Sequence, residues 1–294
     1  MVPYNQKNPF SYVFKFHKAD TFRKLLPFIV LFCLYAWAVA YLVKEYYHLP
    51  DSSPLHKVTL MHALLGFAIS TLLVFRTNTA YDRWWEGRKL WGALVNNSRN
   101  LAMKLNAILP ENMVEDRTFF SKVIPAFALV LHDHLHKENT RTELFEDAQH
   151  GHIFNEIDED KHIPNQVGAI IYKRVQKLLA QKVITGEQLL FINAELQSLA
   201  DICGACERIK NTPIPFSYSV FIKKFIFIYV ATLPFGYVFD LGYLVIPVTA
   251  FILYVLASLE LIAEEIEDPF GGDQNDVPTD KIAANIQKNV ADIL

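Results

Sequence analysis

Thirteen residues near the C-terminal end, EEIEDPFGGDQND (264–276), contain six carboxylates, a dense group of side chains that could bind a metal. Calcium binds six to eight oxygen atoms from carboxylates and backbone carbonyls, so the composition suits a calcium loop. The acids do not follow the spacing of an EF-hand, which also requires glycine at its sixth position. Pro269 and Gly271 indicate a helix end, so the alternative is the polar end of a helix.

A histidine cluster is the second group that could bind a metal. LHDHLHKEN contains His132 and His136 four residues apart, a spacing that places two imidazoles on one helix face and can hold zinc. A third ligand could come from Asp133, His150 or His152. Because no HExxH or other closed ligand set is present, the alternative is a surface helix whose histidines titrate.

CGAC (203–206) is a lone CxxC within a helical pattern. A zinc site would need two more ligands, and a thioredoxin-like site would need a strand before the helix. The small residues are therefore predicted to allow close packing between helices. The chain holds only three cysteines, which excludes a disulfide framework.

Four apolar stretches must position these groups: residues 25–43, 58–75, 225–238 and 241–263. The first two contain no Asp, Glu, Lys or Arg and approach the ~20 residues of a membrane span. Arg23 and Lys24 before the first stretch, and Tyr46 and Tyr47 after it, are typical of a basic flank and an aromatic belt. A soluble protein with four buried helices is the alternative, but uninterrupted stretches of this length are rare outside lipid.

The region between the second and third stretches, 76–220, is charged and amphipathic at helical spacing, which predicts a water-facing helical domain. Pro125 predicts a kink in one of its helices. Basic residues precede the first stretch and follow the second, whereas the loop between them holds only Lys44 and Lys57. The positive-inside rule then puts both termini and this domain in the cytoplasm. The net charge of −3 provides no basic field for nucleic acid.

Three segments carry a resemblance to a known family: FRTNTAYDRWWEGRKLWG (75–92), ICGACERIKNTPIPFSY (202–218) and PFGGDQND (269–276). Together they resemble the bacterial bestrophins, and the resemblance covers nearly the whole chain. It implies an all-α membrane protein, a homopentamer around a central pore, with four transmembrane helices and a large cytosolic helical region per subunit. It also implies an ion channel. Animal members pass anions such as chloride under calcium control, and some bacterial members favour cations such as sodium.

The second apolar stretch is the candidate pore helix. Thr59, Ala63 and Phe67 recur every four residues and share one helical face, and the resemblance implies that this face forms a narrow apolar neck. The family usually has bulkier side chains at the first two positions, so Phe67 is predicted to be the main constriction. Two alternatives to this prediction stay open. The face could pack on a neighbouring helix, or the neck could lie one residue further along the helix. That rival face is formed by Leu60, Leu64 and Ala68.

The resemblance implies a second constriction at the cytosolic mouth, formed by one residue before the helix that ends in ICGACE. Glu187 matches this position, and Ile184 is the alternative. A ring of five Glu187 side chains would favour cations, whereas Ile184 would form a neutral plug. Glu187 could equally be an ordinary glutamate in the first turn of a helix.

The resemblance also bears on the acidic loop, which in animal bestrophins forms a calcium clasp. The matching residues are Asp273 and Asp276 for side-chain ligands, and Glu265 and Asp268 for backbone carbonyls. GGDQND replaces part of the family's run of acids, so the alternative is a helix stop followed by a loop that docks on the next subunit. The glutamates that end the fourth stretch form a helical stripe that could pair with Arg76 or Arg83. They are Glu260, Glu264, Glu265 and Glu267.

The predicted organisation is a cytosolic N-terminal segment (1–24), transmembrane helices 1 and 2 (25–76), a cytosolic helical domain (77–220), transmembrane helices 3 and 4 (221–263), and an acidic loop with a C-terminal tail (264–294). The predicted protein is a channel for monovalent ions in a bacterial plasma membrane, not an enzyme. Its partners are further copies of itself and membrane lipid, with no required cofactor and calcium as the candidate ligand. The alternatives are a metal-dependent membrane enzyme that uses the histidine cluster and a sealed structural membrane protein.

Overall fold

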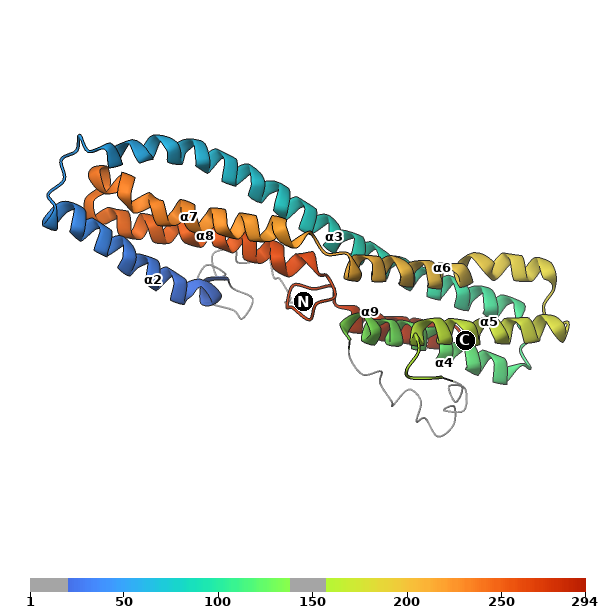
Figure 1. Ribbon diagram of the computed structural model, residues 1–294. Helices are drawn as coiled ribbons and strands as arrows, with labels where there is room; N and C mark the ends of the chain where they lie inside the picture. The colour runs from blue at the N-terminus through green and yellow to red at the C-terminus, as the bar shows by residue number, and fades with distance from the viewer. Residues whose placement is uncertain (1–20, 138–156) are drawn as a thin grey trace. The chain divides into compact units, whose positions relative to one another are not determined.

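The computed structural model describes residues 21–137 and 157–294, which are mainly helical and contain no β-strand (Figure 1). Expectations for residues 1–20, and for His150 and His152, lie outside the described residues. The α-helices are α2 (Thr21–Tyr41), α3 (Val58–Ile108), α4 (Val114–His136), α5 (Ile163–Ala180), α6 (Gly186–Asn211), α7 (Phe216–Leu241), α8 (Val245–Glu267) and α9 (Thr279–Ala291). Shorter helical segments are η1 (Leu42–Tyr46), η2 (Pro54–Lys57) and η5 (Gly242–Leu244).

The described chain divides into two compact units. The apolar unit comprises residues 21–83 and 213–268, and so contains α2, the first half of α3, α7 and α8. The polar unit comprises residues 84–212 and 269–294, with the rest of α3, α4, α5, α6 and α9. The long middle region and the C-terminal tail therefore fold together, although more than fifty residues of sequence separate them.

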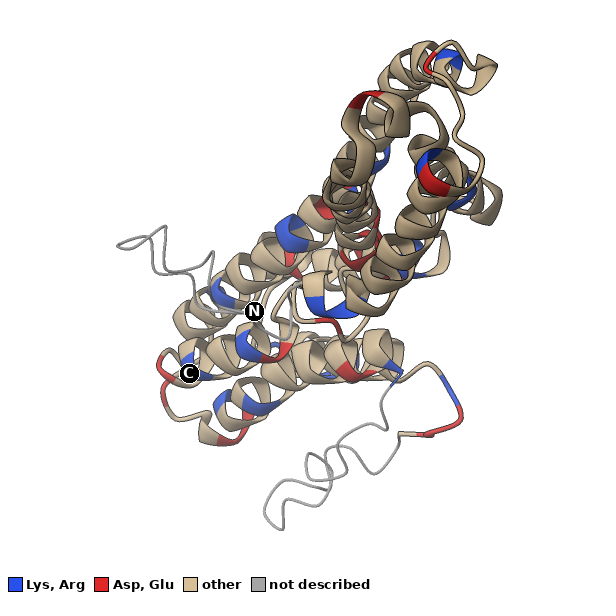
Figure 2. Cartoon of the chain, turned by 90° about the vertical axis from the view of Figure 1, so that its left-hand side faces the viewer, with Lys and Arg blue, Asp and Glu red and all other residues tan. Residues whose placement is uncertain are grey.

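In the apolar unit, α2 packs along α8 and α7, and α7 packs against α8. One buried cluster joins α2, α3, α7 and α8, which contribute Phe32, Ile69, Ile226 and Leu253. Each of these helices holds a run without Asp, Glu, Lys or Arg, and charged residues lie on either side of each run (Figure 2). The runs are 25–43, 58–75, 225–239 and 241–259. A helix of ~20 residues spans the ~30 Å hydrocarbon core of a bilayer, and these runs approach that length.

In the part of the chain that the structure describes, four helical segments are long and apolar enough to cross a membrane: Thr21–Tyr46, Pro54–Ile108, Gly186–Asn211 and Phe216–Glu267. The last one contains α7 and α8, which lie side by side because η5 turns the chain between them (Figure 1). Gly242 permits that turn with φ +53°, a conformation that glycine adopts without a steric penalty. Gly186–Asn211 is the least apolar of the four and packs one face into the core of the polar unit.

The helix α3 runs for 51 residues without interruption. At 1.5 Å per residue it is about 75 Å long, more than twice the ~30 Å thickness of the hydrocarbon core. Only part of α3 can therefore lie in a membrane, and the candidate pore stretch continues directly into the polar FRTNTAYDR sequence as one rigid element.

In the polar unit, α4 packs against both α9 and α5, and α5 packs against α6. Pro125 lies inside α4, which continues past it to His136. Thr185 and Gln188 form a capping box that begins α6, because each side chain bonds to the backbone N–H of the other residue. Cys203 and Cys206 are 1% and 0% exposed and pack into the core of the polar unit. Gly204 is exposed, and a Cβ placed there would meet no atom within 4 Å, so the predicted close packing through the small residues is not seen at Gly204.

Candidate functional site

One face of the first half of α3 is buried within the apolar unit. His62, Ile69, Leu73 and Arg76 lie 7, 4 and 3 positions apart on this face, and each is 1% exposed. The His62 ring lies 3.1 Å from both the Tyr229 carbonyl and the Thr232 hydroxyl through Nε2. These contacts to α7 fix the rotation of α3 about its own axis, and the sequence alone gave His62 no such role.

The opposite face of α3 is open among the described residues. Ala63 and Phe67 are exposed, Phe67 by 75%. Leu60 and Leu64 of the rival face are 79% and 70% exposed. Both candidate neck faces thus lie on the unpacked side of α3, and the choice between them stays a prediction.

Thr59 and Ala68 are half-buried, whereas the other two residues of each candidate face are exposed. Thr59 packs on α7: a Cβ placed at Gly236 would lie 3.1 Å from Thr59 Cγ2. The Thr59 hydroxyl also donates to the His56 carbonyl at 2.8 Å. Further along, the Ser70 and Thr71 hydroxyls donate to carbonyls of the preceding helical turn, at 2.7 and 2.9 Å. These hydroxyl groups donate to carbonyls of their own helix, so they need no hydrogen-bond acceptor from a molecule that covers the open face.

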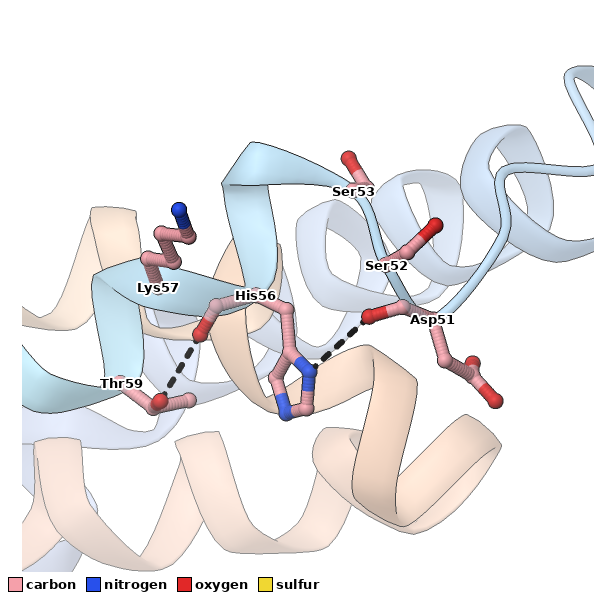
Figure 3. A pocket seen from close by; sticks show the side chains of 6 residues that line it. All are labelled: Asp51, Ser52, Ser53, His56, Lys57 and Thr59. Atoms are coloured by element: carbon pink, nitrogen blue, oxygen red, sulfur yellow. Dashed lines mark hydrogen bonds between the residues drawn. The ribbon is translucent and has the colours of Figure 1, made fainter.

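A pocket lies where the chain enters α3 (Figure 3). Its lining residues are Asp51, Ser52, Ser53, His56, Lys57 and Thr59. His56 orders the loop, because its Nδ1 lies 3.1 Å from the Asp51 carbonyl and its Nε2 lies 3.0 Å from Asp240 Oδ2. The pocket thus carries both signs of charge: Lys57 and Asp51 line it, and Asp240 contacts His56.

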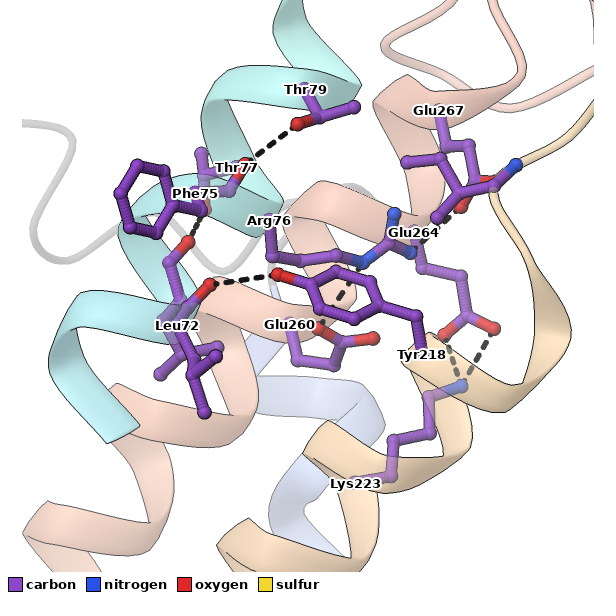
Figure 4. Close-up of polar contacts among 12 residues, drawn as sticks. Leu72, Phe75, Arg76, Thr77, Thr79, Tyr218, Lys223, Glu260, Glu264 and Glu267 are labelled. Atoms are coloured by element: carbon purple, nitrogen blue, oxygen red, sulfur yellow. Dashed lines mark hydrogen bonds and ion pairs between the residues drawn. The ribbon is translucent and has the colours of Figure 1, made fainter. Parts of the chain in front are cut away.

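A buried charge cluster joins α3 to α8 (Figure 4). Arg76 and Glu260 have side chains that are only 1% and 3% exposed, and Arg76 Nε lies 3.5 Å from Glu260 Oε2. Arg76 Nη2 also pairs with Glu267 Oε2 at 2.7 Å. Arg83 Nε donates to the Glu267 carbonyl at 2.9 Å. The expected pairing of the glutamate stripe is therefore confirmed for Arg76, whereas the Arg83 Nε contact is with the backbone carbonyl of Glu267.

Glu267 also fixes the entry to α7, since its Oε1 accepts the backbone N–H of Ile214 at 2.7 Å. The other two glutamates of the stripe bind lysines. Glu265 pairs with Lys24 of α2 at 2.5 Å, and Glu264 pairs with Lys223 of α7 at 2.8 Å. Charged contacts thus tie α2, α3 and α7 to the end of α8.

The acidic loop after α8 is folded rather than solvated. Asp276 is buried, and its Oδ2 accepts the backbone N–H groups of Gly272 and Asp273 at 2.6 and 2.7 Å. Gly272 has φ +102°, a conformation that favours glycine. The loop docks on its own chain: Trp84 Nε1 donates to the Asn275 carbonyl at 2.9 Å, and Lys210 Nζ donates to the Phe270 carbonyl at 3.1 Å.

The four predicted clasp residues have different environments. Glu265 and Asp268 belong to the apolar unit, and Asp273 and Asp276 belong to the polar unit. The carboxylate of Glu265 is already paired with Lys24, which leaves its carbonyl as the predicted ligand. Asp273 is exposed and Asp276 is buried. Calcium binding by this set stays a prediction.

The two candidates for the cytosolic aperture also differ in exposure. Ile184 is 2% exposed and belongs to the core of the polar unit. Glu187 is exposed in the first turn of α6. A hydrogen bond with Thr185 and one with its own backbone lower the pKa of Glu187, so this carboxylate is ionised at neutral pH. Of the two, Glu187 is the side chain that can act on an ion in water.

The histidines of α4 point to different neighbours. His132 is buried, with Nδ1 at 2.7 Å from the Thr279 hydroxyl of α9. His136 Nδ1 lies 2.9 Å from the His132 carbonyl. Among the described residues, the expected group of His132, His136 and Asp133 does not form a three-ligand cluster; His134 instead meets His162 and Glu207.

The buried thiols of α6 are unreactive. Burial, together with the nearby Glu207 charge, raises the pKa of Cys203 to about 12, and burial also raises the pKa of Cys206 to about 12. Thiolates are the reactive form of cysteine, so neither residue serves as a nucleophile or redox centre at neutral pH.

Comparisons with known proteins bear on the whole chain. A family described as bacterial and fungal bestrophin protein matches residues 1–292. A voltage-dependent anion channel-forming protein of Nostoc sp. is 37% identical over 248 residues, which cover 83% of this chain and 79% of the relative. The protein of that description from Escherichia coli, YneE, is 31% identical over 293 residues, or 98% and 92% of the two chains. The crystal structure of a mutant bestrophin homologue from Klebsiella pneumoniae matches with a TM-score of 0.79 at 27% identity, covering 92% of this chain and 98% of that chain.

The buried charge cluster generates a stability prediction. Arg76→Leu should destabilise the protein by about 3–5 kcal/mol, because it leaves Glu260 buried without its counter-charge. Adding Glu260→Gln removes that second charge and should restore part of the loss. Unfolding of the purified protein in detergent measures both effects. As a control, Lys223→Met breaks a half-exposed pair and should change stability by at most about 1 kcal/mol. Strictly additive effects of the two substitutions would show that Arg76 and Glu260 are not coupled.

Proposed function

Because the chain belongs to the bacterial and fungal bestrophin family, we propose that it forms a homopentameric channel for monovalent ions, with α3 of each subunit lining a central pore. The open face of α3 is the observation that carries this proposal. His62 and Arg76 hold the other face against α7 and α8, so a charge-free, membrane-length stretch presents Ala63 and Phe67 outward. Five such faces around an axis would enclose a pore with an apolar neck.

Phe67 is the proposed main constriction. Its ring is 75% exposed in the single chain and is the largest side chain on the predicted neck face. A ring of five phenyl groups makes a narrow apolar passage that can close by losing its water. Thr59, half-buried against Gly236, contributes less to such a constriction than Phe67, and Ala63 contributes little volume.

The proposed location is the bacterial plasma membrane, with both termini in the cytoplasm. The charge-free runs of the four helices would lie in the hydrocarbon core. Arg23, Lys24, Arg76 and Arg83 lie at one end of these runs, and Lys44 and Lys57 lie at the other. The more basic end faces the cytoplasm under the positive-inside rule.

Two observations bear on the sign of the conducted ion. The relatives from Nostoc sp. and Escherichia coli are named as anion channel-forming proteins, which favours anions. The ionised Glu187 favours cations if five copies surround the cytosolic aperture. We propose conduction of monovalent ions, with the neck setting the rate and the charge at the aperture setting the sign.

Flux measurements test the neck. Liposomes that hold the purified protein should pass sodium chloride. Phe67→Ala should raise the flux several-fold, because it removes the bulky phenyl groups that form the proposed main constriction. Leu64→Ala, on the rival face, is the matched control and should change the flux little. A larger rise in flux with Leu64→Ala than with Phe67→Ala would assign the neck to Leu60, Leu64 and Ala68. Impermeable liposomes with both variants would favour a sealed structural protein.

Reversal potentials in asymmetric sodium chloride test the aperture. Glu187→Gln removes five negative charges from the proposed ring, so the reversal potential should shift toward the chloride equilibrium potential. Glu111→Gln changes another exposed glutamate and should leave the reversal potential unchanged. An unshifted potential in Glu187→Gln would remove this residue from the conduction path.

Calcium is proposed as a regulator at most, and not as a requirement. The hydrogen bonds of Asp276 to Gly272 and Asp273 hold the loop without an ion, so flux should persist in a calcium chelator. A change in flux on adding calcium, absent in Asp273→Asn, would assign the clasp to Asp273 and Asp276 with the carbonyls of Glu265 and Asp268. Loss of all flux in the chelator would contradict the proposal.

A further inference from the structure

Three potential metal ligands converge within the polar unit. His134 lies near the C-terminal end of α4, His162 is the N-cap of α5, and Glu207 lies on α6. Both histidine Nε2 atoms contact the same carboxylate oxygen, Glu207 Oε1, at 2.7 Å from His134 and 2.6 Å from His162. The two imidazole rings lie 4.5 Å apart. One donor atom of each side chain falls within 4.8 Å of the others.

The spacing of these atoms is close to that of a metal shell. Tetrahedral zinc, with ligands at 2.0–2.2 Å, separates its ligand atoms by about 3.3 Å. The contacts of the two Nε2 atoms with Glu207 Oε1 are shorter, at 2.7 and 2.6 Å, so these distances must lengthen before an ion can fit between the three atoms. The side chains are 35%, 28% and 32% exposed for His134, Glu207 and His162, so each can make that adjustment and an ion can reach them from water.

A bound metal would change the tautomer of His162. The His162 Nδ1 accepts the backbone N–H of Asn165 at 3.2 Å, so the ring proton sits on Nε2 and points to Glu207. If Nε2 binds a metal ion instead, the neutral ring carries its proton on Nδ1. That nitrogen can then no longer accept the Asn165 N–H, so the ring exchanges its helix cap for a bond to the metal.

We propose that His134, His162 and Glu207 form a binding site for a zinc-class transition-metal ion. Two imidazoles and one carboxylate are ligands that Zn²⁺ accepts, whereas Ca²⁺ and Mg²⁺ prefer shells made only of oxygen. The site leaves a fourth position for water. A bound ion would join α4, α5 and α6, at the end of α4 and the start of α5. This site is separate from the acidic loop and from the open face of α3.

Metal binding to the untagged, full-length protein in detergent tests the site. The protein is stripped with a chelator, titrated with zinc chloride by calorimetry, and passed through gel filtration for metal analysis. The wild type should retain one zinc ion per chain. Glu207→Gln and His134→Gln should each weaken binding by at least ~10-fold, a loss that even removal of an outer-shell partner can produce.

Two variants keep the test independent of folding and of neighbouring histidines. His162→Asn removes the imidazole but supplies a residue that caps helices well, so it should fold and lose zinc. His136→Gln changes the histidine that contacts the His132 carbonyl and should bind zinc like the wild type. The proposal is overturned if the wild type retains no zinc, if His162→Asn retains it fully, or if His136→Gln abolishes binding. None of these outcomes depends on ion flux, so they leave the channel proposal unaffected.

Discussion

The contact of Arg76 with Glu260 and Glu267 is the constraint on which the apolar unit depends. These charges lie where the charge-free runs of α3 and α8 end, and two of the side chains are almost fully buried. A buried charge is tolerated only when an opposite charge and hydrogen bonds compensate it. Glu267 also accepts the backbone N–H of Ile214, at the entry to α7. One side chain therefore positions three helices at the same end of the unit.

The orientation of α3 follows from this constraint. Arg76 anchors one end of the buried face, and His62 anchors the same face fourteen residues earlier through α7. A helix held at two points on one side cannot rotate to bury the other. The apolar side chains of the other face, Phe67 among them, stay exposed among residues 21–137 and 157–294. A subunit of a pore needs such a surface, because the pore face can be completed only by other copies.

The same logic separates side chains that look alike in the sequence. His132, His134 and His136 lie within five residues, yet the first contacts Thr279 of α9 and the second contacts Glu207 of α6. On a helix, residues two apart point in different directions, and the neighbours decide what each one does. The acidic loop is similar: its carboxylates are chemically equivalent, but Asp276 is buried in backbone hydrogen bonds whereas Asp273 remains exposed.

The sequence by itself determined the helical class, the four apolar helices and the polar region between them, because apolar length and helical period are local properties of the chain. It also pointed to the pairing of Arg76 with the glutamate stripe, since opposite charges at a membrane boundary have few other partners. Only the tertiary structure decided the single 51-residue α3, the anchoring role of His62, the burial of Ile184 and the meeting of His134, His162 and Glu207. Each of the last three depends on contacts between residues far apart in the chain, up to 170 positions for His62 and Thr232. No local pattern records which distant helix face a side chain will meet.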